Sequence, residues 1–102
     1  MEKIRLGIIG IGNMGSEHCR LIMSGQTPEI ALTCVADPRQ DRRDWAQQTL
    51  PAGTGIYADG MSLIRAHACD AVLIATPHEL HPPLAEAALR AGLHVLSEKP
   101  AG

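Results

Sequence analysis

Ile-Arg-Leu-Gly-Ile-Ile-Gly-Ile-Gly-Asn-Met-Gly, residues 4–15, is the stretch that decides the fold of this chain. Its first half, residues 4–9, is mostly apolar and predicts a buried strand, and three glycines follow at once in the spacing G-x-G-x-x-G. A strand that runs through this spacing into a helix predicts a dinucleotide site. In such a site Gly10 permits the tight turn, Gly12 lets the backbone approach a pyrophosphate, and Gly15 lets the helix pack close to the strand.

The rest of the chain alternates strand-like and helix-like segments without a long linker or a repeat. Further strands are expected at 30–36, 56–58, 71–75 and 95–97, and helices at 13–24, 39–49, 61–67 and 84–91. Alternation of this kind predicts a parallel sheet with right-handed crossovers and helices on both faces. The expected fold class is α/β, a Rossmann-type doubly wound sheet with five visible strands in the order 3-2-1-4-5. The ligand crevice would lie at the carboxyl ends of the first and fourth strands.

Local signals refine these elements. The apolar face of the first helix is expected to consist of Met14, His18, Leu21 and Ile22. Gly25 and Gly92 are expected to end the helices before them, and Asp59 is a candidate cap for the helix at 61–67.

Composition limits the class of protein. The 102 residues suffice for one domain with one core, and 45% of them are hydrophobic. The net charge of −2 argues against nucleic acid as a partner, and no apolar run approaches the ~20 residues that span a membrane. The cysteines, Cys19, Cys34 and Cys69, are odd in number and well separated, which favours buried free thiols in a cytoplasmic protein over a disulfide or a zinc site, with a reactive thiol as the alternative. We expect no bound metal.

Asp37 is the candidate ribose ligand. It ends the second predicted strand, about 20 residues beyond the glycines, where a carboxylate accepts hydrogen bonds from the adenosine ribose. Its charge repels a 2′-phosphate, which favours NAD over NADP, although Arg39, Arg42 and Arg43 leave NADP open. The alternative is that Asp37 is a turn residue before Pro38.

The glycine loop and Asp37 indicate a nucleotide without indicating a reaction. Methyltransferases also hold a nucleoside with a glycine-rich first loop and an acidic residue at the second strand. The reaction must therefore be inferred from the last third of the chain.

That last third resembles the Gfo/Idh/MocA family of glucose–fructose oxidoreductases and inositol dehydrogenases. Residues 75–81, ATPHELH, and residues 85–100, AEAALRAGLHVLSEKP, are similar to the family pattern T-P-N-x-x-H followed by A-x-x-A-L-x-x-G-x-H-V-x-x-E-K-P. With the glycine loop and Val35-Ala36-Asp37, the resemblance extends over essentially the whole chain. It implies cofactor-binding roles for Gly10, Gly12, Asn13, Met14, Gly15, Asp37, Arg39, Thr76, Pro77, His78, His81, Glu98 and Lys99.

Lys99 is the catalytic residue that the resemblance implies. Its ammonium would orient the substrate hydroxyl and stabilise negative charge on oxygen while hydride leaves for the cofactor. Without the resemblance Lys99 would be an ordinary surface lysine, and His81 a capping or packing residue. His78 stands where the family usually has Asn, and a histidine can still donate a hydrogen bond to a ribose or to the nicotinamide.

The resemblance also implies a second domain that holds a small-molecule substrate and often the interface of a homo-oligomer. Residues 1–102 are then an incomplete NAD(P)-binding domain, cut before a sixth strand, and we expect them to be inactive alone. The implied function is that of an NAD(P)-dependent oxidoreductase acting on a sugar, polyol or related hydroxy compound. A non-catalytic nucleotide-binding module that senses or scaffolds remains the alternative, and a methyltransferase-type nucleoside site is a third.

Overall fold

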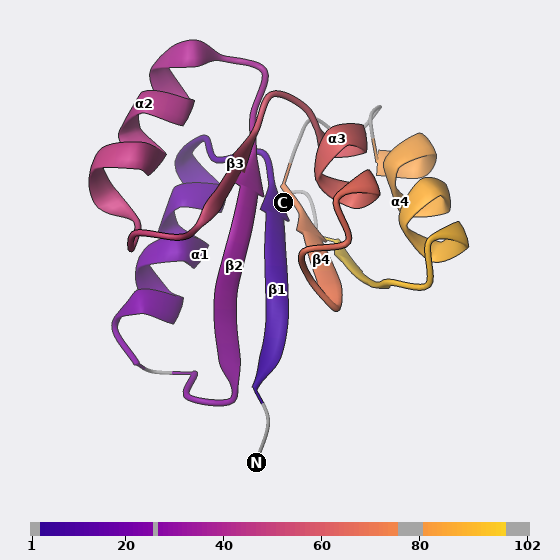
Figure 1. Cartoon of the computed structure of the whole chain (residues 1–102), viewed down its shortest axis with the longest axis horizontal. Coiled ribbons are helices and arrows are strands. Elements are labelled where there is room, and N and C mark those ends of the chain that lie inside the picture. Colours follow the sequence, from indigo (N-terminus) through magenta and orange to yellow (C-terminus); the bar gives the residue numbers. More distant parts are fainter. Residues whose placement is uncertain (1–2, 26, 76–80, 98–102) are drawn as a thin grey trace, which may run out of the picture.

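The computed structural model describes residues 3–25, 27–75 and 81–97. In these residues a sheet of five parallel strands is flanked by four helices (Figure 1). The strand order is β3-β2-β1-β4-β5, which confirms the predicted Rossmann-type sheet. The elements are β1 (Ile4–Ile9), α1 (Asn13–Met23), β2 (Ile30–Ala36), α2 (Gln40–Thr49), β3 (Gly55–Tyr57), α3 (Gly60–Arg65), β4 (Ala71–Ile74), α4 (His81–Arg90) and β5 (His94–Ser97).

The helices cover both faces of the sheet. Helices α1 and α2 lie on one face, and α3 and α4 lie on the other (Figure 1). Ile8 faces α1 and α2, whereas Ile9 and Ile74 face α3 and α4, and all three are almost completely buried. Strands covered on both faces read as continuous apolar runs, which is why β1 and β4 are so apolar. Among the described helices, none is long and apolar enough to cross a membrane.

The ends of several elements differ from the predicted ones by one to three residues. The largest difference is in α4, which begins at His81 rather than at residue 84. Pro82 and Pro83 fit its first turn because the first N–H groups of a helix have no partner within it. Gly25 and Gly92 follow α1 and α4 with φ angles of 83° and 84°, in the left-handed conformation that glycine adopts easily.

The predicted inward face of α1 is wrong in one respect. Leu21 is 45% exposed, whereas Cys19 is fully buried. Gly15 sets this face, since an ideal Cβ there would lie 1.8 Å from the carbonyl oxygen of Gly10 and 3.5 Å from Cγ2 of Ile8. The buried line of α1 therefore runs through Gly15 and Cys19, one residue later than the apolar pattern predicts.

Strand β2 contains a bulge that the sequence pattern did not reveal. Leu32 and Cys34 lie opposite consecutive residues of β1, so Thr33 is the extra residue. Leu32 packs on the side of α1 and α2, but Cys34 faces α3 and α4, and Val35 faces α1 and α2 again. In a regular strand Cys34 would share the face of Leu32. The bulge therefore sets the direction of the last residues of β2 just before Asp37.

Candidate functional site

The glycine loop joins β1 to α1 at the carboxyl edge of the sheet. It lies beside the point where the strand order reverses, since both β2 and β4 pair with β1. Gly10 has a φ angle of 91°, and its N–H donates to the carbonyl oxygen of Ala36 over 2.7 Å. This hydrogen bond ties the loop to the end of β2. Gly15 packs so closely on the Gly10 carbonyl that no side chain fits there. The positive φ angle of Gly10 also disfavours a side chain, so steric constraints explain why both residues are glycine.

The start of α1 has the features of an anion site. Gly12 is the N-cap residue and provides no side-chain hydrogen bond to the helix. Free N–H groups at a helix start, together with the positive end of the helix dipole, attract phosphate. Asn13 and Met14 begin this helix, and their side chains lie outside the part of the chain that the structure describes.

Asp37 lies directly against the glycine loop. The Ile11 N–H donates to its Oδ2 over 3.0 Å, and the Arg39 N–H donates to its Oδ1 over 2.9 Å. The Arg42 guanidinium pairs with Oδ2 over 3.3 Å. Asp37 is only 2% exposed, so these partners hold and cover the carboxylate. The bond to Ile11 shows that Asp37 does more than form a turn, because it links the end of β2 to the loop after β1.

The three arginines after Asp37 have different partners. Arg39 pairs with the exposed Asp41, whose pKa it lowers chiefly through this hydrogen bond. Arg43 donates to the carbonyl oxygens of Asp37 and Pro38 over 2.9 and 3.1 Å. Arg42 reaches both the Asp37 carboxylate and the glycine loop, where its guanidinium carbon lies 3.1 Å from the position that a Cβ on Gly12 would take.

The sequence pointed to Arg39, Arg42 and Arg43 as possible partners of a 2′-phosphate, but only Arg39 was predicted as a cofactor-binding residue. The signal that separates Arg39 from Arg42 is helical position. Arg39 is the N-cap of α2, whereas Arg42 is inside the first turn of that helix and on the side that faces the glycine loop.

An apolar cavity of about 250 Å³ lies next to this site, between the ends of β1 and β2 and the starts of α3 and α4. Asp59 at its rim caps α3, since the Ser62 N–H donates to Oδ1 over 2.7 Å and lowers the carboxyl pKa. Gly60 lets α3 pack closely against the other residues of the cavity wall, because a Cβ there would come within 2.9 Å of Leu84 and Ile9. The cavity is lined by Ile9, Gly10, Ala36, Pro38, Asp59, Gly60, Met61, Pro83 and Leu84.

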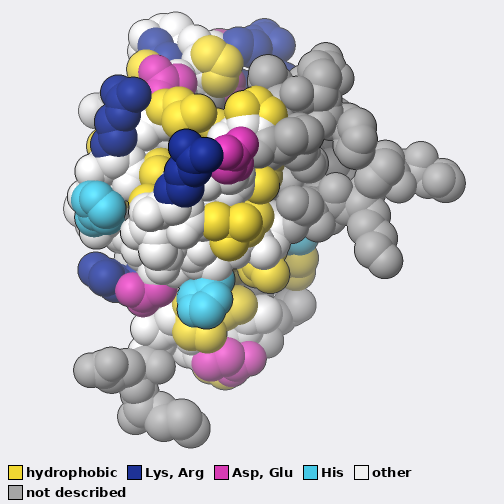
Figure 2. Space-filling view, turned by 90° about the vertical axis from the view of Figure 1, so that its right-hand side faces the viewer, with side chains coloured by type: hydrophobic (Ala, Val, Ile, Leu, Met, Phe, Trp, Pro, Cys, Tyr) yellow, Lys and Arg dark blue, Asp and Glu magenta, His cyan; other side chains and the backbone are white. Residues whose placement is uncertain are grey.

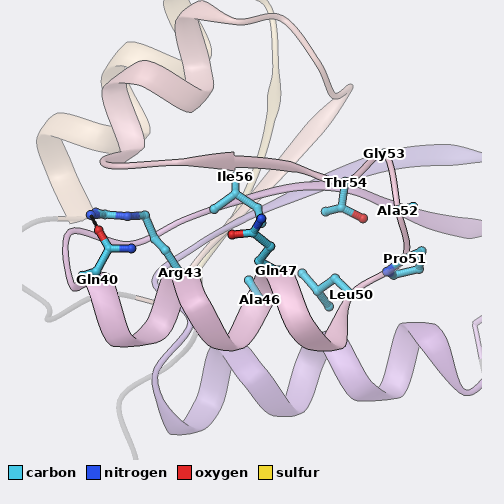
Figure 3. Close-up of a pocket in the computed structure, with 10 residues that line it drawn as sticks. All are labelled: Gln40, Arg43, Ala46, Gln47, Leu50, Pro51, Ala52, Gly53, Thr54 and Ile56. Carbon is cyan, nitrogen blue, oxygen red and sulfur yellow. Dashed lines mark hydrogen bonds between the residues drawn. The ribbon is translucent and has the colours of Figure 1, made fainter.

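Two hollows of more than twice this volume lie away from the glycine loop. One, of about 680 Å³, runs between α2 and residues 51–56 and is lined by Arg43, Gln47 and Ile56 among others (Figure 3). The other, of about 690 Å³, lies on the outer side of α3 and α4, the side on which apolar, basic, acidic and histidine side chains are mixed in Figure 2. Neither is lined by the glycine loop or by Asp37, so size does not make them the candidate site.

Several predicted site residues fall outside the described residues. Thr76, Pro77 and His78 follow β4 in the sequence, and Glu98 and Lys99 follow β5. Strands β4 and β5 are parallel neighbours, and Ile74 and Ser97 at their ends lie side by side at the carboxyl edge. His81 is the first residue of α4, and its side chain is not described. In residues 3–25, 27–75 and 81–97, no three His, Cys, Asp or Glu side chains are grouped to hold a metal.

Comparison with known proteins identifies the family of this chain. The model of the Gfo/Idh/MocA family, described as an oxidoreductase family with an NAD-binding Rossmann fold, matches residues 4–102. Inositol 2-dehydrogenase 4 of Saccharopolyspora erythraea is 38% identical over 97% of this chain, and the match covers 29% of that protein. The rhizopine catabolism protein MocA of Rhizobium meliloti is 41% identical over the whole chain, which covers 31% of its length.

Solved structures of dehydrogenases share this fold. The crystal structure of scyllo-inositol dehydrogenase from Lactobacillus casei, with bound NAD(H) and scyllo-inositol, superimposes with a TM-score of 0.88 at 31% identity. The match covers 97% of this chain and 28% of that one. The chain therefore spans about 30% of the length of the relatives that it matches.

Proposed function

We propose a function for this chain from the family to which it belongs, the Gfo/Idh/MocA oxidoreductases. The chain is the NAD-binding part of an enzyme that moves hydride between nicotinamide and a sugar, polyol or related hydroxy compound. The observation that carries the proposal is the Asp37 carboxylate, held against the glycine loop at the reversal of strand order. The relatives named as inositol dehydrogenases support the substrate class.

The described residues fit an NAD molecule laid across the carboxyl edge of the sheet. The uncapped start of α1 would hold the pyrophosphate, and Asp37 would accept the adenosine ribose hydroxyls. The apolar cavity beside Pro38 and Met61 would take the adenine ring. Since Arg42 covers the Asp37 carboxylate, the ribose would replace the Arg42 partner and leave the hydrogen bond from Ile11 in place.

The chemical step is proposed to depend on Lys99. Bound NAD accepts or returns the hydride. The Lys99 ammonium would donate a hydrogen bond to the substrate oxygen, which positions the carbinol carbon and stabilises the charge that develops on that oxygen. Glu98, Thr76, Pro77, His78 and His81 would surround the nicotinamide ribose, as the family resemblance implies. The substrate itself would be held by residues beyond those of this chain, because the relatives are much longer.

Calorimetric titration with NAD, NADP and S-adenosylmethionine tests the binding part of the proposal. We expect NAD to bind most tightly. Asp37→Asn should weaken NAD binding roughly tenfold to a hundredfold, since a hydrogen bond to a charged group contributes about 1.5–3 kcal/mol. Asp41→Asn is the matched control, because Asp41 is exposed and pairs with Arg39. Preferential binding of S-adenosylmethionine would overturn the assignment.

Turnover requires a separate test in a protein that joins this chain to a substrate domain. Lys99→Ala should lower kcat with inositol or a related polyol by at least roughly a hundredfold, with NAD affinity little changed. Tight NAD binding without any polyol oxidation would instead favour a non-catalytic module.

A further inference from the structure

The three cysteines divide between the two faces of the sheet. Cys34 and Cys69 belong to the core under α3 and α4, whereas Cys19 belongs to the core under α1 and α2. All three are free and buried. The bulge at Thr33 causes this division, because a regular β2 would turn Cys34 to the opposite face.

The Cys34 and Cys69 thiols converge on one point above β1. That point is the vacant Cβ position of Gly7, which lies 2.8 Å from Sγ of Cys34 and 3.1 Å from Sγ of Cys69. A side chain at residue 7 would separate the two sulfurs. Gly7 thus leaves the space in which two cysteines from β2 and from the turn before β4 lie together.

The two thiols are chemically unequal. The interaction between the two thiols lowers the pKa of Cys69 and, with burial, raises the pKa of Cys34. The Thr33 hydroxyl holds the surrounding backbone, donating to the Ala68 carbonyl over 2.8 Å and lying 3.8 Å from the Cys34 sulfur. Cys69 is 3% exposed and Cys34 is fully buried, so a small oxidant meets Cys69 first.

We propose that Cys34 and Cys69 form a redox site that a hydroperoxide converts into a disulfide. The Cys69 sulfur attacks the peroxide, the O–O bond breaks, and an alcohol or water leaves as Cys69 becomes a sulfenic acid. The Cys34 sulfur then attacks the Cys69 sulfur, the S–O bond breaks, and water leaves with the Cys34 proton. Two thiols lose two electrons and two protons, and the peroxide takes up both.

The product would join β2 to the turn before β4 across β1. Cys34 is on the strand that leads directly to Asp37, so the cross-link would fix the strand that positions the ribose ligand. The redox chemistry itself depends only on the two sulfurs. The proposal therefore stands apart from the function proposed above.

Peptide mapping after peroxide treatment tests the proposal directly. Trypsin places the three cysteines in separate peptides, residues 6–20, 21–39 and 66–90. The folded chain is treated with hydrogen peroxide, blocked with N-ethylmaleimide in denaturant, digested and analysed by mass spectrometry. We expect peptides 21–39 and 66–90 to become linked, with the protein lighter by two hydrogen atoms. This link should form roughly tenfold faster than Cys19 is oxidised, since burial raises the pKa of the Cys19 thiol to about 11.

Matched variants separate the pair from the third cysteine. Cys19→Ala should form the same link at the same rate. Cys34→Ser should instead accumulate a sulfenic acid on Cys69, which dimedone traps, because the serine hydroxyl keeps a polar partner beside Cys69 but cannot form a disulfide. Equal oxidation of all three thiols, links that include peptide 6–20, or separate oxidation of Cys34 and Cys69 without a link would each overturn the proposal. Because the readout is a mass, the result does not depend on NAD binding.

Discussion

Gly15 has no room for a side chain. A Cβ on residue 15 would lie 1.8 Å from the Gly10 carbonyl oxygen, which is backbone and has no rotamer to change. We expect Gly15→Ala to destabilise the fold by at least the roughly 1–3 kcal/mol of ordinary overpacking. It should also weaken NAD binding by roughly tenfold or more, because the loop must move. Urea unfolding and calorimetry measure the two effects.

Gly25 provides the control for that variant. Its φ angle is 83° and a Cβ there meets nothing within 4 Å, so Gly25→Ala adds backbone strain without a clash. We expect a loss of about 1–2 kcal/mol in stability and no change in NAD affinity. Equal losses of NAD affinity in both variants would contradict the steric argument for Gly15.

Arg42 is the second residue whose change should be diagnostic. Of the three arginines after Asp37, it is the one whose guanidinium contacts both the carboxylate and the glycine loop. A 2′-phosphate next to Asp37 would meet Arg42, so Arg42→Ala should lower NADP affinity relative to NAD by roughly tenfold. Arg39→Ala should leave the ratio unchanged, because Asp41 holds its guanidinium. An unchanged NADP-to-NAD affinity ratio for Arg42→Ala, or a changed one for Arg39→Ala, would contradict the prediction that Arg42 and not Arg39 contacts a 2′-phosphate.

At the scale of one element, α3 depends on its cap. Asp59 accepts a hydrogen bond from the Ser62 N–H, and this bond is the main reason why its pKa is lowered. Asp59→Ala should cost about 1 kcal/mol of unfolding free energy at pH 7. A carboxyl whose pKa is lowered on folding stabilises the fold above its unfolded pKa, and this contribution is lost as pH falls through the folded value.

The difference between the wild type and Asp59→Ala should therefore shrink below about pH 4. Asp59→Asn is the matched control, since an amide caps a helix without ionising, and its stability relative to Asp59→Ala should stay constant. Urea unfolding at several pH values measures all three proteins. A difference that stays the same down to pH 2 would show that the ionised carboxyl is not what stabilises α3.

Element type and order followed from the sequence, but side-chain direction did not in two places. Alternating patterns and turn residues were sufficient to predict the order 3-2-1-4-5. The bulge at Thr33 has no sequence signal, because Leu32, Cys34 and Val35 are all apolar and fit either face. The face of α1 was predicted one residue early because close backbone packing at Gly15 outweighs the apolar stripe.

At the scale of the whole molecule, the topology predicts that the glycine loop and Asp37 lie together, but it does not predict which side chains contact Asp37. Parallel strands bring their carboxyl ends to one edge, which places the glycine loop and Asp37 together from topology alone. The ion pair between Arg42 and Asp37 depends on the orientation of the first turn of α2, which the sequence does not specify. The apolar cavity depends on Gly60 and Leu84, which no motif marks.

The proposed NAD site is formed only when the sheet is folded, so NAD binding should stabilise the whole chain. A ligand that binds only the folded state raises the free energy of unfolding by RT ln(1 + [L]/Kd), which is about 2.7 kcal/mol at one hundred times Kd. We expect NAD at that excess to raise the urea midpoint accordingly, and to slow hydrogen exchange most at residues 10–16 and 37. Gly15→Ala should show little of this gain at the same NAD concentration. A midpoint that stays in place, while calorimetry reports saturation, would mean that NAD does not bind the native glycine loop.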